Sequence, residues 1–194
     1  MYVITGGAGF IGSNVAHTLD ARDAGPLVIV DRLRDGDKWR NIAKRPLADI
    51  VHPDNVHAFL AENTRAIDGV VHMGAISATT ERDADLIVET NFRLSRDLWT
   101  WCAEHDKSYV YASSAATYGD GNEGFNDEMS QGGLSKLLPL NPYGWSKLLF
   151  DRWVEAELRN DVPRPPQWAG LRFFNVYGPN EYHKGRMASV VFHT

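Results

Sequence analysis

The chain has 194 residues, of which 43% are hydrophobic and six are tryptophans, so it can bury one core of ordinary domain size. Its formal net charge is −5 and no long run carries one sign, which argues against nucleic acid or an anionic membrane as the main partner. No apolar stretch reaches transmembrane length and no signal segment is apparent, so we expect a cytoplasmic protein. The single Cys102 cannot form an internal disulfide and is expected to be a small buried residue. We expect no metal site.

The N-terminus combines a predicted strand at residues 2–5 with a glycine-spaced turn, GGAGFIG. Gly6 allows a tight bend, Gly9 lets the backbone approach a pyrophosphate, and Gly12 lets the following helix pack closely on the sheet. The free N–H groups at the start of that helix favour phosphate. This order of strand, turn and helix predicts a dinucleotide-binding loop.

An amphipathic helix is predicted directly after this turn, because Ile11, Val15 and Leu19 recur every four residues and form an apolar stripe. Further strands are predicted at 27–31, 69–72, 108–112 and 168–174, with a short one within 47–51, and helices at 53–63, 85–105 and 141–159. Strands that alternate with helices predict an α/β protein with a Rossmann-type, doubly wound parallel sheet.

Small, polar or charged residues follow four of these strands, at 31–32, 74–76, 113–114 and 175–177. Ligands of such sheets bind outside the carboxyl ends of the strands, so these positions are candidate binding residues.

Tyr143 and Lys147 form a YxxxK pair at the start of the predicted helix 141–159, and their spacing places both side chains on one helical face. A nearby ammonium favours the phenolate form of tyrosine, so the pair is a plausible general acid and base for a hydroxyl proton. Ser114, in YASSAATYG, can hydrogen-bond the reacting oxygen, or it can cap local backbone groups. Thr117 is a further candidate polar contact, and Asn91 is a candidate structural support that holds water or kinks its helix.

Four motifs together, TGGAGFIG, YASSAATYG, NPYGWSK and FFNVYGP, resemble the extended short-chain dehydrogenases/reductases, the nucleotide-sugar epimerase and dehydratase group. Three further segments, VDRLRDGDKWRN, HMGAISATTERD and YGPNEYHKGRMASVVFH, resemble the ADP-L-glycero-D-manno-heptose 6-epimerase family. The resemblance implies epimerisation of ADP-D-glycero-D-manno-heptose at C6 by transient oxidation and re-reduction, for the lipopolysaccharide core. It also implies a cytoplasmic homo-oligomer, a pentamer, that takes ADP-heptose as its small-molecule substrate.

The resemblance assigns roles to residues by position. The implied catalytic residues are Ser114, Tyr143, Lys147 and Lys184. The implied cofactor-binding residues are Gly6, Gly9, Phe10, Ile11, Gly12, Asp31, Arg32, Lys38, Asp49, Ile50, Gly74, Ala75, Ile76, Asn91, Tyr143 and Lys147. The implied substrate-binding residues are Ser77, Ser114, Ala115, Asn175 and Lys184.

The expected cofactor is NADP, with NAD as an alternative. Asp31 at the end of the second strand can bind a ribose 2′-hydroxyl, which favours NAD. Arg32 and Lys38 can instead bind a 2′-phosphate. The resembled family tends to use NADP despite an aspartate here, and it carries a lysine near the position of Pro53, which this chain lacks.

We expect residues 1–174 to form the dinucleotide-binding domain and residues 175–194 to begin a truncated substrate-binding region. Two alternatives remain open: a UDP-sugar 4-epimerase, which shares nearly every motif, and a non-catalytic dinucleotide-binding protein. A 4,6-dehydratase is disfavoured, because that family has an Asp-Glu pair where this chain has Ala115 and Ala116.

Overall fold

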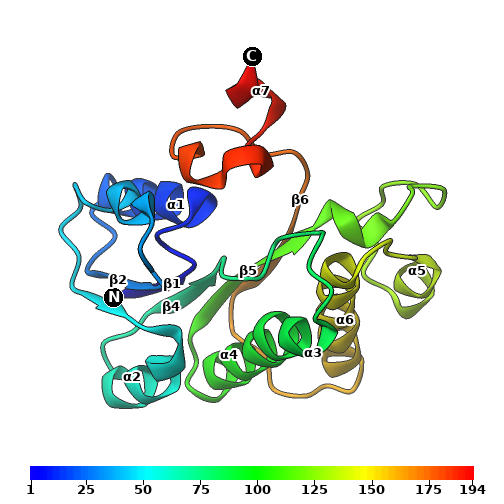
Figure 1. Ribbon diagram of the computed structural model, residues 1–194. Helices are drawn as coiled ribbons and strands as arrows, with labels where there is room; N and C mark the ends of the chain where they lie inside the picture. Colours follow the sequence, from blue (N-terminus) through cyan, green and yellow to red (C-terminus); the bar gives the residue numbers. More distant parts are fainter. The chain divides into compact units, whose positions relative to one another are not determined.

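A computed structural model describes residues 1–194, apart from the side chains of residues 186 and 187 (Figure 1). The chain forms two compact units, one made of residues 1–74 together with 175–194 and the other of residues 75–174. The first unit is therefore discontinuous in sequence, and the second is continuous.

The first unit contains a parallel sheet in the order β3-β2-β1-β4. Its strands are β1 (Tyr2–Thr5), β2 (Leu27–Val30), β3 (Asp49–Val51) and β4 (Gly69–His72). From β1, the chain adds β2 and β3 on one side and then β4 on the other. This reversal makes β1 and β4 flank a topological switch point, the usual ligand position in a doubly wound sheet.

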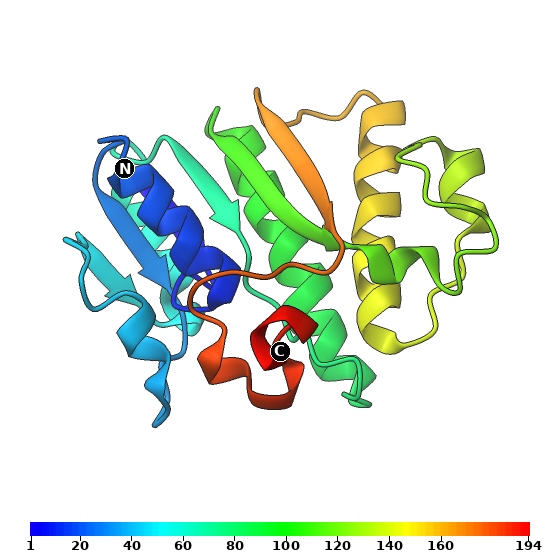
Figure 2. The same ribbon diagram turned by 90° about the horizontal axis from the view of Figure 1, so that it is seen from above.

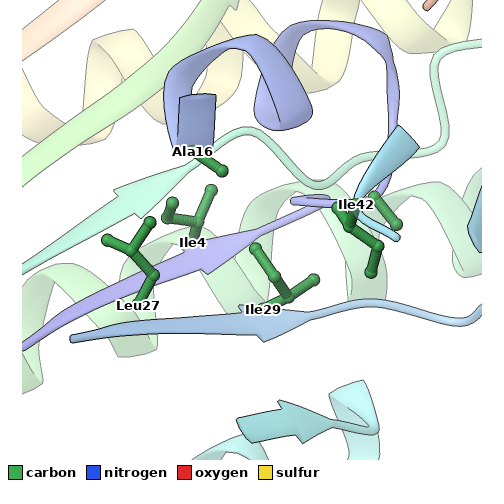
Figure 3. Close-up of a cluster of buried hydrophobic side chains, with 6 residues drawn as sticks. Ile4, Ala16, Leu27, Ile29 and Ile42 are labelled. Atoms are coloured by element: carbon green, nitrogen blue, oxygen red, sulfur yellow. The ribbon is translucent and has the colours of Figure 1, made fainter. Parts of the chain in front are cut away.

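Helix α1 (Phe10–Asp20) covers one face of β1 and β2, as Figure 2 shows from above. The core beneath it is formed by Ile4, Ala8, Ala16, Leu27, Ile29 and Ile42 (Figure 3). The predicted stripe of Ile11, Val15 and Leu19 is only partly buried, and the fully buried positions include Gly12 and Ala16. The helix lies so close to the sheet that small residues form its line of contact, while the larger side chains pack on either side.

The remaining helices of the first unit are short. They are η1 (Asp37–Asn41), η2 (Pro53–Asn55), α2 (Val56–Asn63), η5 (Tyr182–Met187) and α7 (Val190–His193). The C-terminal segment is fastened to α1 by two hydrogen bonds: Asn14 Nδ2 donates to the Pro179 carbonyl at 2.9 Å, and Asn180 Nδ2 donates to Ser13 Oγ at 3.0 Å.

The second unit contains a parallel pair of strands in which Tyr109 aligns with Trp168 and Ser114 with Phe173. Its elements are α3 (Ala84–Ile87), η3 (Val88–Arg93), α4 (Leu94–Glu104), β5 (Ser108–Ser114), η4 (Ala115–Tyr118), α5 (Gln131–Lys136), α6 (Pro142–Arg159) and β6 (Trp168–Phe173). The predicted helix 85–105 is interrupted, because η3 is a π-helix. Parallel strands and helices in both units confirm the α/β class.

Aromatic side chains dominate the core of the second unit. The Trp99 ring on α4 contacts Tyr109 and Trp168 at centroid distances of 5.9 and 5.1 Å, and Phe150 on α6 contacts Tyr111 at 4.8 Å. These contacts pack both helices against the strands. Cys102 is buried as expected, and burial raises the pKa of its thiol to about 12. Among the helices that the structure describes, none is both long and apolar enough to cross a membrane.

Candidate functional site

The glycine turn closes tightly on itself and on the end of β4. Gly6 has φ +62°, and a Cβ at this position would lie 2.7 Å from Gly74 Cα. A Cβ on Gly12 would overlap the Gly6 carbonyl, so α1 can approach the turn only with glycine there. The predicted tight bend at Gly6 is confirmed, and Gly12 allows α1 to pack closely on the turn itself.

Gly9 is less crowded than the other two glycines, because a Cβ there would meet a single backbone atom. A Cβ there would meet only the Gly6 oxygen, at 3.0 Å, within 4 Å. Gly9 also caps α1, whose first N–H groups have no partner within the helix. An open glycine beside the positive end of a helix, at the switch point of the sheet, fits the pyrophosphate of a dinucleotide.

Asp31 connects the end of β2 to the glycine turn. Its carboxylate accepts hydrogen bonds from the Ala8 amide at 2.9 Å and the Arg32 amide at 2.7 Å, and it contacts the Lys38 ammonium. Arg32 points instead to Asp54, at 2.6 Å. The structure thus brings Lys38 to Asp31 and directs the guanidinium of Arg32 toward η2.

The C-terminal segment brings further side chains to the same part of the first unit. Lys184 Nζ lies 5.3 Å from the centre of the Phe10 ring, at the start of α1. Asn41 Nδ2 donates to the Ala8 carbonyl at 2.8 Å and lies 3.2 Å from His183 Nδ1. Sequence reasoning missed Asn41 and His183, although the position of His183 beside Lys184 was a usable signal.

The second unit brings together Ser114, Tyr143 and Lys147. The Asn141 side chain caps α6 by accepting from the Gly144 amide at 2.8 Å, and this fixes the start of the helix. Gly144 lies so close to η4 that a Cβ would approach the Ala116 carbonyl to 2.6 Å. This close packing brings Tyr143 near Ser114, the side chain that influences its pKa.

Burial governs the titration of this group. It raises the pKa of the Tyr143 phenol, and the hydrogen bond from Ser114 opposes that rise. Burial also lowers the pKa of Lys147 to about 8, against the attraction of the Asp151 carboxylate. The sequence led us to expect that the Lys147 ammonium lowers the pKa of Tyr143. The pKa of Tyr143 is instead raised, because desolvation of the phenol outweighs the other influences.

The side chains of Asn91 and Thr117 form hydrogen bonds with backbone groups. Asn91 exchanges two hydrogen bonds with the Ile76 backbone, at 2.8 and 3.0 Å, and its Nδ2 lies 3.1 Å from Ser146 Oγ. It lies within the π-helix η3, which agrees with a kinked helix. Thr117 Oγ1 donates to the Ser114 carbonyl at 2.8 Å, so it supports the strand end.

Several sequence-predicted residues lie outside these two groups. Ser77 and Asn175 are exposed, and Ala115 is half-buried in η4. Asp49 and Ile50 lie on the edge strand β3, where Ile50 is 45% exposed. Among the side chains that the structure describes, no group of three acidic, histidine or cysteine residues is placed to hold a metal ion.

Asp151 is a buried polar residue of the second unit that sequence reasoning also missed. It lies one helical turn after Lys147 and accepts hydrogen bonds from β5 and β6. Its spacing from Lys147 was visible in the sequence, but such a pair is usually a solvated one on a helix surface.

A glycine turn at the switch point of a parallel, doubly wound sheet defines a Rossmann-type dinucleotide-binding fold. The chain belongs to the NAD dependent epimerase/dehydratase family, which it matches over residues 2–194.

Three similar proteins illustrate the relationship. The chain is 52% identical to an ADP-L-glycero-D-manno-heptose-6-epimerase of Fusobacterium nucleatum, over 100% of this chain and 58% of that relative. It resembles the crystal structure of the Helicobacter pylori enzyme of the same name, with TM-score 0.80 and 31% identity over 99% of this chain and 60% of the other. It also resembles a Thermus thermophilus UDP-glucose 4-epimerase in complex with NAD, with TM-score 0.69 and 27% identity over 92% and 56% of the two chains. The chain thus spans a little over half the length of these proteins.

Proposed function

We propose that this chain is the cofactor-binding part of an isomerase that converts ADP-D-glycero-D-manno-heptose to ADP-L-glycero-D-manno-heptose at C6, for the lipopolysaccharide core. The observation that carries the proposal is that Tyr143 and the buried Lys147 lie one helical turn apart on α6, with Ser114 close enough to Tyr143 to influence its pKa. The 52% identity to an enzyme of that name supports the choice of substrate.

The residues of the second unit would handle the proton of the C6 hydroxyl. Tyr143 would take this proton as the carbon is oxidised and return it as the carbon is reduced on its other face. Ser114 would orient the same oxygen through its hydroxyl, and the Lys147 ammonium would favour the phenolate when Tyr143 has lost its proton. Lys184 would hold the substrate or act as a second acid and base. When bound, a nicotinamide dinucleotide would supply the hydride acceptor and donor.

We propose NADP as the dinucleotide, with NAD as the alternative. The Asp31 carboxylate would repel a 2′-phosphate, but it is occupied by two backbone amides and faces the Lys38 ammonium. The Lys38 ammonium reduces the repulsion between Asp31 and a 2′-phosphate. Arg32, the next residue after Asp31, is partly exposed, so its guanidinium is accessible to a phosphate. The glycine turn would hold the pyrophosphate, with Gly74 and Ile76 following β4.

We also propose that the protein acts in the cytoplasm as a homo-oligomer, a pentamer, and that residues 175–194 begin the substrate-binding region. These proposals are supported by the resemblance to the ADP-heptose epimerases. The contact of Lys184 in η5 with the Phe10 ring of α1 supports the last of them.

The experiment incubates a protein that carries the rest of the substrate lobe with each ADP-heptose epimer and NADP, and resolves the products by chromatography. Either epimer should give the same equilibrium mixture without net change in NADPH absorbance. Conversion of UDP-glucose to UDP-galactose without reaction of ADP-heptose would instead establish the 4-epimerase. Dinucleotide binding without turnover of either substrate would indicate a non-catalytic protein.

A further inference from the structure

A buried ion pair in the second unit lies beside the proton-transfer residues. The Asp151 side chain is 1% exposed, and its Oδ2 accepts from Arg172 Nε at 3.1 Å. The same oxygen accepts from Ser113 Oγ at 2.9 Å, while Oδ1 accepts from the Tyr111 hydroxyl at 3.1 Å. A carboxylate held by three donors is fixed in both position and orientation.

Arg172 has other hydrogen-bond partners besides Asp151. Its Nη1 donates to the Tyr118 hydroxyl and to the Asn126 carbonyl, each at 3.2 Å, and its guanidinium lies 5.1 Å from the centre of the Tyr118 ring. Arg172 is therefore held by neutral acceptors as well as by the Asp151 carboxylate, which fixes the guanidinium in place.

Two of the contacts place Asp151 next to the residues proposed for proton transfer. Ser113 directly precedes Ser114 at the end of β5, so its hydrogen bond joins this strand end to α6. On α6, Asp151 lies one turn beyond Lys147, and Lys147 lies one turn beyond Tyr143.

Lys147 needs a nearby negative charge because it is itself buried, with 4% of its surface exposed. Desolvation favours a neutral amine. The groups that contact the Asp151 carboxylate are Tyr111 and Ser113 on β5 and Arg172 on β6. Asp151 is the carboxylate whose attraction opposes the desolvation of Lys147.

We propose that Asp151 is a positioning residue that keeps the Lys147 ammonium charged next to Tyr143, with its carboxylate anchored by Ser113, Tyr111 and Arg172. This inference rests on the proposed function for its catalytic meaning. A purely structural ion pair would hold β5, β6 and α6 together without affecting the protonation of Lys147.

The consequence for protonation follows from the pKa of Lys147, which burial lowers to about 8 although Asp151 raises it. At neutral pH, most of the lysine is then still protonated. A neighbouring opposite charge shifts a pKa by about one unit or more. Without the carboxylate, the midpoint would approach neutrality and a large share of the lysine would be neutral.

The test titrates Lys147 by nuclear magnetic resonance in the 194-residue chain labelled with ¹³C at lysine Cε, without substrate or dinucleotide. The Lys147 signal is assigned by its loss in Lys147→Met. In Asp151→Asn, which keeps the shape of the side chain, the midpoint should fall by about one pH unit or more. Asp151→Glu should keep it near the parent value. Asp97→Asn, an exposed aspartate paired with Arg96, should leave it unchanged.

An unchanged Lys147 midpoint in folded Asp151→Asn would overturn the proposal and leave a structural ion pair. Loss of near-ultraviolet circular dichroism would show that the single variant does not fold. The double variant Asp151→Asn, Arg172→Gln then leaves no uncompensated guanidinium. It should also lower the midpoint, but by less, because the loss of a nearby cation acts in the opposite direction. Because no turnover is measured, this outcome is independent of whether ADP-heptose is the substrate.

Discussion

At the scale of single residues, the proposed role of Tyr143 depends on one atom, the phenolic oxygen that would accept the proton of the C6 hydroxyl. In a protein that includes the substrate lobe, Tyr143→Phe should lower kcat by ~10²–10⁴-fold, the usual contribution of a positioned acid or base. Dinucleotide affinity by calorimetry should change little, since the ring remains. Tyr2→Phe, at the start of β1, should have the parent rate. Epimerisation by Tyr143→Phe at the parent rate would remove Tyr143 from the mechanism.

The two cations that follow β2 should decide between the dinucleotides. Arg32→Ala together with Lys38→Ala should weaken NADP by about tenfold or more, because each lost charge-assisted hydrogen bond is worth ~1.5–3 kcal/mol. NAD, which lacks the 2′-phosphate, should bind nearly as before. Arg40→Ala removes an exposed arginine paired with Asp37 and serves as control. Equal weakening of NADP and NAD in calorimetry would count against the assignment.

The sequence predicted the site residues that belong to a local sequence motif. It missed the residues whose importance depends on being buried in the folded chain. Spacing on one helix predicted that Tyr143 and Lys147 share a face, and the strand end predicted Ser114 nearby. Asp151 has the same spacing from Lys147, but only its burial between two strands separates it from a surface pair. The contact of Lys38 with Asp31 likewise depends on η1, a short 3₁₀ helix that no periodic pattern announces.

At the scale of elements, two substitutions in the glycine turn should have different effects: one should reduce stability, and the other should abolish dinucleotide binding in a folded chain. Gly12→Ala should lower the unfolding free energy by about 1–3 kcal/mol, as in overpacked cores, because its Cβ would overlap the Gly6 carbonyl and move α1. Gly9→Val should keep a folded chain and lose dinucleotide binding, because its side chain would fill the open space beside the turn. Urea unfolding and calorimetry measure the two effects.

Gly36→Ala is the matched control for the turn, because nothing lies within 4 Å of its Cβ direction. It should change neither stability nor affinity. If Gly9→Val bound NADP and NAD with parent affinity, the pyrophosphate assignment would be wrong.

The strands were the most predictable elements. Each is a short apolar run bounded by turn residues, and the observed ends lie within two residues of the predicted ones. The helices were predicted with less detail. The region 85–105 has continuous amphipathic character, so its sequence gives no sign that the Asn91 side chain bonds to the Ile76 backbone within a π-helix. Helix α5 was missed because its QGGLSK sequence is short and rich in glycine.

The whole molecule should lose stability in alkaline solution. Burial raises the pKa of Tyr109 and Tyr111 well above 10, and that of Cys102 to about 12. In the unfolded chain, tyrosine ionises near pH 10 and cysteine near 8.5. Above these values the folded chain binds more protons than the unfolded chain, so the unfolding free energy falls as pH rises. Lys147 acts oppositely between about pH 8 and 10.5, because its folded pKa is the lower one.

Urea unfolding at pH 8, 9.5 and 11 measures this balance, and the unfolding free energy should be clearly lower at pH 11 than at pH 8. Cys102→Ala should make the decline begin at higher pH, since it removes the thiol that ionises first on unfolding. A free energy that is the same at pH 11 as at pH 8 would mean that the buried phenols and the thiol ionise in the folded chain.

The discontinuous first unit has a consequence for biosynthesis. Residues 1–74 leave the ribosome first, yet Asn14 and Ser13 on α1 receive their partners, Pro179 and Asn180, only after the whole second unit has been translated. The second unit is continuous, so it can complete its own packing while the nascent chain is still being extended. The surface of α1 therefore lacks these partners until residues 179–180 have been synthesised, and the segment that carries Lys184 follows the whole second unit.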